Sequence, residues 1–139
     1  DGAKKKMKQS KLPPMRFEST DGFPIYVGRN NRQNDELTFK LARKDDVWCH
    51  ASKVHGSHVI ISCGGQKPPD DTVTQAAQLA AYYAETGGGQ NIPVDVTTVK
   101  QVKKTPGGKP GMVIYHTYRT AIVNPYPDIR VDPLNAEQK

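Results

Sequence analysis

The stretch PPDDTVTQAAQLAAYYAETGGG, residues 68–89, decides the fold class of this 139-residue chain. Its apolar residues recur at the spacing of one helical face, namely Val73, Ala76, Ala77, Ala80 and Ala84. Asp70 and Asp71 suit the positive N-terminal end of a helix, and the three glycines after Thr86 break it. The stretch therefore predicts one major helix at about residues 70–86, whose small alanine side chains allow close packing onto a sheet.

Predicted strands lie on both sides of the helix, and those at residues 47–50 and 58–63 are rich in β-branched residues. We expect strands at residues 15–20, 23–27, 47–50, 58–63 and 94–99, and a last hairpin from residues 112–115 and 120–123. The pair Asp21-Gly22, between the first two strands, is a turn typical of β-hairpins. A short helix is expected at about residues 36–42, with Asp35 as its cap. The predicted fold class is α+β, with a mixed, largely antiparallel sheet.

Composition divides the chain into one central domain and two polar ends. Residues 1–14 are rich in lysine and almost free of apolar side chains, so we interpret them as a basic, disordered tail or linker. Residues 126–139 have no apolar periodicity and are interpreted as a polar C-terminal tail. Residues 15–125 remain as a single domain, long enough to bury a core of its own.

Charge and cysteine usage favour a cytoplasmic protein with a polyanionic partner. The formal net charge is +6, which suits nucleic acid but also keeps a small domain soluble. Cys49 and Cys63 both lie in apolar runs, where free thiols pack as small hydrophobic groups. No stretch approaches the ~20 apolar residues of a membrane span, so no membrane partner is expected.

Metal binding and catalysis find little support in the sequence. A zinc hypothesis arises because thiolates and imidazoles gather in one segment: Cys49, His50, His55, His58 and Cys63. However, Cys49 and His50 are adjacent in a predicted strand, so their side chains would point to opposite faces. Apolar surroundings would also keep both thiols unreactive. With no Gly-x-Ser-x-Gly elbow or Walker-type loop present, we expect no metal, no cofactor and no enzymatic activity.

Two polar segments are candidates for nucleic-acid binding. Residues 28–35 are wholly polar, and their guanidinium and amide groups can donate to phosphates or read base edges. Turn formation alone is the alternative. Residues 100–111 form a basic Gly/Pro-rich loop, in which exposed lysines would neutralise phosphates without reading sequence. Trp48 suits the core better than a base-stacking platform, although it could serve as both.

Several segments, in the same order along the chain, resemble the NFACT-R domain. The resemblance is carried by GRNNRQND at 28–35, KDDVWCH at 44–50, GSHVII at 56–61, AAQLAAYY at 76–83, VKQVKK at 99–104 and KPG at 109–111. It extends from about Phe17 to Val123, which is nearly all of the foldable chain.

The resemblance implies RNA binding on or near the ribosome. NFACT-R is the C-terminal module of the family of RqcH, NEMF and bacterial fibronectin-binding protein A homologues. Members of this family are understood to bind stalled large ribosomal subunits and, in bacteria, to support alanine tailing of nascent chains. The implied partners are RNA, as tRNA or large-subunit ribosomal RNA, and the large subunit itself. A module for adhesion or protein interaction that binds fibronectin is the alternative.

The candidate RNA-binding residues come from the two polar segments and from the shared motifs. They are Arg29, Asn30, Asn31, Arg32, Gln33, Asn34, Asp46, Trp48, His50, Ser57, His58, Lys100, Lys103, Lys104 and Lys109. For Asp46, His50 and His58 the sequence leaves two roles open. They either contact RNA directly or form a hydrogen-bonded scaffold that shapes the loops.

Overall fold

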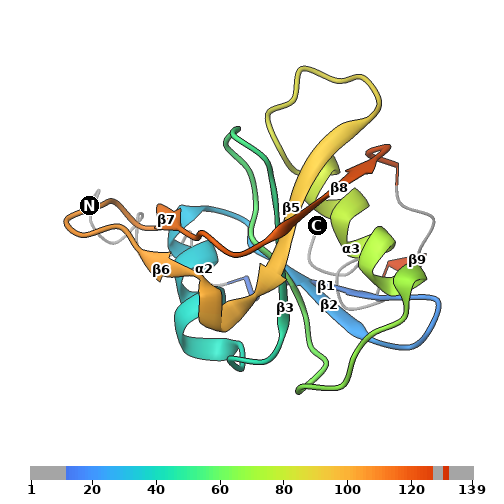
Figure 1. Cartoon of the computed structure of the whole chain (residues 1–139), viewed down its shortest axis with the longest axis horizontal. Helices are drawn as coiled ribbons and strands as arrows, with labels where there is room; N and C mark the ends of the chain where they lie inside the picture. The colour runs from blue at the N-terminus through green and yellow to red at the C-terminus, as the bar shows by residue number, and fades with distance from the viewer. Residues whose placement is uncertain (1–11, 127–129, 132–139) are drawn as a thin grey trace.

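A computed structural model describes residues 12–126 and 130–131 as an antiparallel sheet with a helix packed on one face (Figure 1). Seven strands follow the order β8-β5-β3-β4-β2-β1-β9. They are β1 (Met15–Glu18), β2 (Pro24–Val27), β3 (Val47–Ala51), β4 (Val59–Ile61), β5 (Ile92–Thr98), β8 (Arg119–Val123) and β9 (Arg130–Val131). Every pairing between these strands is antiparallel. The predicted α+β class is confirmed.

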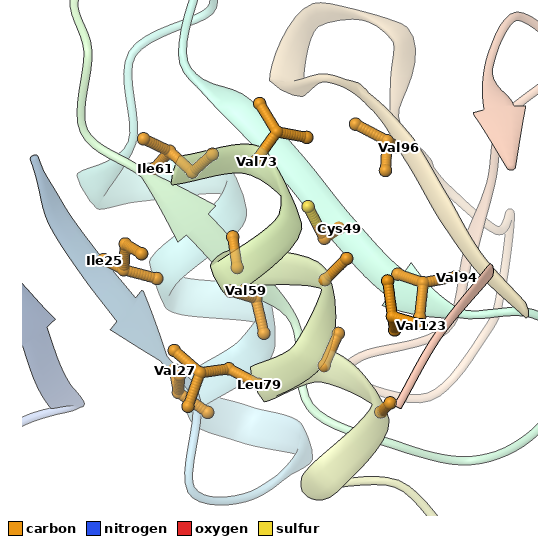
Figure 2. Packing of buried hydrophobic residues seen from close by; sticks show 14 of the residues in the cluster. Ile25, Val27, Cys49, Val59, Ile61, Val73, Leu79, Val94, Val96 and Val123 are labelled. Carbon is orange, nitrogen blue, oxygen red and sulfur yellow. The ribbon is translucent and has the colours of Figure 1, made fainter. Parts of the chain in front are cut away.

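Helix α3 (Asp70–Tyr82) packs across the sheet through the alanine face that the sequence predicts. Its alanines are fully buried, and Val73 and Leu79 point toward the strands in Figure 2. The strands contribute Ile25, Val27, Cys49, Val59, Ile61, Val94, Val96 and Val123 to this core. Because burial raises the pKa of the Cys49 thiol to about 12, this cysteine acts as a packing residue.

The helix ends at Tyr82, four residues before the predicted end. Ala84 forms an isolated antiparallel bridge with Gly56, in the loop between β3 and β4. A Cβ atom on Gly56 would lie only 2.8 Å from the Cβ of Ala84, so the close approach requires glycine. Tertiary pairing therefore ends α3 before the three glycines are reached.

The opposite face of the sheet is covered by short elements. Helix α2 (Asn31–Glu36) continues into the π-helical turn η1 (Leu37–Leu41), and the 3-10 turn η2 (Val99–Gln101) leads into a hairpin of β6 (Lys103–Lys104) and β7 (Val113–Ile114). Leu37, Trp48, Ile60, Val99 and Val102 form a second core beneath these elements. Since Trp48 is 0% exposed, it is a core residue and offers no platform for stacking a base.

Three local predictions need correction. The short helix spans α2 and η1 rather than residues 36–42, and its cap is Asn30, whose side chain accepts the Gln33 amide at 2.8 Å. The segment predicted as a basic loop at residues 100–111 includes the last two residues of η2 and the whole of β6. The expected last hairpin does not form, because β7 pairs with β6 and β8 pairs with β5. Val113 packs on the second core and Val123 on the first, so these two segments serve opposite faces of the sheet.

The first hairpin is confirmed by the pairing of β1 with β2, and Gly22 adopts the left-handed φ of +88° that the turn requires. The predicted tails lie mostly outside the described residues. Within residues 126–139 the structure describes Tyr126 and β9, which pairs with β1. Among the described residues, none of the helices has the length and apolar character needed to cross a membrane.

Candidate nucleic-acid interface

The polar segment at residues 28–35 forms the entry to α2, and part of it supports the backbone. Gln33 is buried, accepts the Arg29 amide at 2.7 Å and donates to the Leu12 carbonyl at 2.9 Å. Asn34 is buried as well, and its Oδ1 accepts the His58 amide at 3.0 Å. Both side chains are therefore engaged with main-chain groups of neighbouring segments and are withdrawn from solvent.

The remaining side chains of this segment face outward. Asn30, Asn31 and Arg32 are exposed, and Arg29 is half-buried with its Nε donating to the Pro13 carbonyl at 2.7 Å. These groups carry amide and guanidinium donors, the chemistry that contacts phosphates and base edges. Four of the six predicted residues in this segment thus remain accessible to a ligand.

The β6–β7 hairpin lies against α2, so the two polar segments predicted to bind RNA are neighbours in space (Figure 1). Lys104 Nζ lies 3.0 Å from Asp35 Oδ2 and 5.3 Å from the centre of the Phe39 ring. Gly111, with φ of +85°, packs so closely on Asn31 that an added Cβ atom would lie 3.2 Å from the Cβ of Asn31. Lys104 is therefore part of the joint between hairpin and helix.

Exposed cations cover this joined surface. We call it the α2–hairpin surface and define it by Asn31, Arg32, Lys103, Lys104 and Lys109. Lys103 and Lys104 follow one another in β6, and both residues are exposed. Lys100 lies apart, next to the Lys44–Asp45 turn, with its Nζ 3.8 Å from an Asp45 carboxylate oxygen.

His58 lies at the centre of a buried hydrogen-bond network beneath this surface. Its Nε2 is 3.1 Å from the Gly111 carbonyl, which can only accept, so Nε2 carries the proton. Its Nδ1 therefore accepts from the Thr38 hydroxyl at 2.8 Å, and that hydroxyl accepts from Trp48 Nε1 at 3.3 Å. Burial lowers the pKa of His58 from 6.5 to about 3, with a further contribution from His50. This neutral, 1% exposed ring fastens the hairpin to the sheet.

His50 and Asp95 extend the network along the sheet. The His50 ring stacks on Trp48 with centroids 5.6 Å apart, and its Nδ1 donates to the Ala51 carbonyl at 2.6 Å. Burial lowers the pKa of His50. Asp95, its cross-strand partner, accepts from the Tyr115 hydroxyl at 2.6 Å and the Thr120 hydroxyl at 2.9 Å. Both residues are held within the sheet.

Asp46 is a buried carboxylate that ties two turns together. Its Oδ2 accepts the Arg43 amide at 2.8 Å, and its Oδ1 accepts the amides of Cys63 and Gly64 at 3.0 and 2.9 Å. The residue is 3% exposed. Asp46 and His58 are thus both buried and engaged with groups of the domain itself.

The residues behind the zinc hypothesis can be placed in the structure. Cys49 faces the first core while His50 stacks on Trp48 of the second, so the two side chains diverge. Within the described residues, no three His, Cys, Asp or Glu side chains are grouped so that they could hold an ion. Every buried side-chain nitrogen or oxygen in this part of the chain has a hydrogen-bond partner.

The sequence and structure both match known proteins. Residues 14–117 match the family described as the NFACT protein RNA binding domain. The chain belongs to the NFACT-R family. It is 43% identical over 112 residues to the Rqc2 homologue RqcH of Bacillus subtilis (strain 168), covering 81% of this chain and 19% of that protein. It is 50% identical over 101 residues to the Rqc2 homologue RqcH of Streptococcus pneumoniae serotype 2, covering 73% of this chain and 18% of that protein.

A solved structure resembles this NFACT-R domain closely. It is the C-terminal part of the fibronectin/fibrinogen-binding protein from Streptococcus suis, with a TM-score of 0.81 and 43% identity over 86% of this chain and 48% of that one. The NFACT-R chain spans about a fifth of the length of these two RqcH proteins.

Sequence reasoning missed several residues that position other side chains in or beneath the α2–hairpin surface. Thr38 orients His58, Asp95 holds Tyr115, and Asp35 pairs with Lys104. Their partners are 20 or more residues distant along the chain, so no local pattern marks them. The one available signal was chemical and concerns only Thr38 and Asp95, because polar residues on largely apolar elements require partners when buried.

Proposed function

We propose that this domain binds RNA through the α2–hairpin surface. The observation that supports this most directly is that the folded chain joins two polar segments, distant in sequence, into one exposed cationic surface. Such a surface neutralises phosphates, which provides most of the affinity of nucleic-acid binding. The match to a family described as RNA-binding agrees with this chemistry.

The experiment is a measurement of RNA affinity against salt concentration. Lys103 and Lys109 are exposed and have no side-chain partner among the described residues, so we change both to glutamine. Lys104 is left intact because it holds Asp35 and Phe39. If both lysines contact phosphates, the log-log salt slope falls in magnitude by roughly two units and affinity drops for unrelated RNA sequences alike.

A matched control removes the same charge elsewhere. Lys67→Glu lowers the net charge by the same two units, but Lys67 lies in the loop before α3, next to Asp70 and Val73. This variant should retain the salt slope of the wild type. Equal slopes for wild type and the Lys103/Lys109 variant, with both folded by circular dichroism, would contradict the proposal.

We further propose that the RNA is tRNA or ribosomal RNA of the stalled large subunit, and that the domain supports C-terminal alanine tailing without performing chemistry itself. The support is the similarity to two RqcH proteins, of which this chain covers about a fifth. This role implies a cytoplasmic location. Co-sedimentation with purified large subunits, weakened in the Lys103/Lys109 variant and unaffected by Lys67→Glu, is the expected result.

Fibronectin binding is a second candidate, favoured by the name of the Streptococcus suis protein whose structure is similar. The two functions differ in their response to salt. An interface based on phosphate contacts weakens steeply with salt, whereas an apolar protein interface does not. Retention on immobilised fibronectin that persists at high salt, together with no retention on RNA, would favour adhesion over RNA binding.

A further inference from the structure

An open polar pocket of about 480 Å³ borders the α2–hairpin surface. Its lining comes from three separate segments: Arg29, Asn30, Asn31 and Asn34 at the start of α2, His55, Gly56 and Ser57 between β3 and β4, and Tyr83 and Glu85 after α3. Asn31 belongs both to this pocket and to the contact with the hairpin at Gly111. The pocket is therefore continuous with the proposed phosphate-binding surface.

Backbone pairing fixes the walls of the pocket. The Ser57 amide donates to the Tyr83 carbonyl at 3.1 Å, and the Glu85 amide donates to the His55 carbonyl at 2.8 Å. On the other side, the Ser57 hydroxyl donates to the Gly28 carbonyl at 2.7 Å. Three segments distant in sequence are thus held together by two main-chain bonds and the Ser57 hydroxyl, and the other lining side chains are carried on this fixed backbone.

Tyr83 gives the pocket an aromatic wall. Its ring is half-buried and is supported by Tyr82, with centroids 4.9 Å apart and planes at 85°, and by Phe17 at 6.3 Å. Burial raises the pKa of Tyr83, so its hydroxyl stays neutral and can donate a hydrogen bond. A supported aromatic ring beside amide groups is how proteins stack and read unpaired bases.

The charges in the pocket distinguish a nucleotide from a bare phosphate. Arg29 supplies a cation suited to a phosphate oxygen, while Glu85, whose Oε2 lies 4.0 Å from His55 Nε2, supplies an exposed carboxylate that would repel one. A carboxylate instead accepts from base amino groups or from the 2′-hydroxyl of ribose. The combination of one cation, one carboxylate and one aromatic ring matches a whole nucleotide, and the volume is typical of small-ligand sites.

We propose that this pocket binds one unpaired nucleotide of the RNA, with its base against Tyr83 and its phosphate near Arg29. The inference rests on the RNA-binding function proposed above and adds a preference for RNA with single-stranded or looped nucleotides. Duplex RNA, whose bases are stacked internally, reaches only the α2–hairpin surface.

The test compares an RNA hairpin containing an unpaired loop with a blunt duplex of equal phosphate number. Wild type should bind the hairpin about tenfold more tightly, because stacking one base on an aromatic side chain contributes that much affinity. Tyr83→Leu should abolish this preference while leaving duplex affinity unchanged, and Tyr83→Phe should retain it. Tyr126→Leu is the matched control, since Tyr126 is 70% exposed and lies outside the pocket lining.

A second measurement needs no variant and covers the case in which Tyr83→Leu does not fold. Wild-type protein is crosslinked to RNA that carries 4-thiouridine in its loop, and the crosslinked peptide is mapped. A peptide containing Tyr83 or His55 is expected. Equal affinity for hairpin and duplex, or crosslinks confined to other segments, would overturn the pocket assignment and leave RNA binding intact. Absence of binding to either RNA would instead refute the proposed function.

Discussion

Replacing Asp46 tests whether this residue supports the fold or contacts RNA. Three backbone amides converge on its carboxylate, from Arg43 to Oδ2 and from Cys63 and Gly64 to Oδ1. The carboxylate is buried, so water cannot readily replace it as acceptor. Asp46→Ala removes all three bonds, whereas Asp46→Asn keeps an oxygen for Cys63 and Gly64 and turns an N–H group toward the Arg43 amide.

The expected loss in free energy of unfolding follows from the number of backbone amides that lose their acceptor. An unsatisfied donor costs about 1–3 kcal/mol, and the three bonds are partly buried, so we take about 1 kcal/mol for each. Asp46→Ala should lower the free energy of unfolding by about 3 kcal/mol and Asp46→Asn by about 1 kcal/mol. Urea denaturation measures both, and an unchanged m-value indicates that stability itself has changed.

RNA affinity provides the second part of this test. Asp46→Asn should fold and bind RNA as wild type does, because the side chain faces the turns and is 3% exposed. The reasoning is refuted if Asp46→Asn retains full stability but loses RNA affinity, since Asp46 would then be a ligand. It is equally refuted if Asp46→Ala and Asp46→Asn are equally stable.

Three further predictions concern the scaffold. Burial holds the pKa of His58 at about 3, below the 6.5 of the unfolded chain. The contribution of neutral His58 to the free energy of unfolding is therefore complete above pH 6.5 and is lost as the pH falls below 6.5, by up to about 1.4 kcal/mol per pH unit. His58→Gln should flatten this pH dependence in urea titrations between pH 6.5 and 5. Ala80→Leu should overpack the helix–sheet contact and cost about 1–3 kcal/mol, while Gln78→Glu, at a half-buried position, should change stability by at most about 0.5 kcal/mol; equal melting temperatures would disprove this packing. Gly111→Ala should cost about 1–2 kcal/mol by strain at positive φ and crowding against Asn31, and a wild-type urea midpoint would contradict the close contact.

Local sequence patterns predicted most of the fold. The alanine series predicts α3 because a helix presents every third or fourth residue on one side, and the β-branched residues predict β2 to β5 because strands favour such side chains. The turn at Gly22 was also predictable, since glycine adopts positive φ without steric cost. These signals act within a few residues of one another and need no knowledge of the rest of the chain.

The functional surface needed the tertiary structure. The sequence selected both polar segments, but it could not separate exposed Asn31 from buried Asn34, because identical amides differ only in what packs around them. Likewise, Lys104 and Lys103 are neighbours in sequence, yet only Lys104 pairs with Asp35.

The sequence by itself determined the α+β class, the main helix, the family resemblance and the polar segments, because each depends on local spacing or composition. Only the tertiary structure decided the end of α3, the partner of β7 and the buried contacts of Asp46 and His58. It also brought Tyr83 next to Arg29. The physical reason is that bonds such as Ser57 to Tyr83 and His58 to Gly111 join residues 26 and 53 positions apart, and their geometry exists only once both cores have packed.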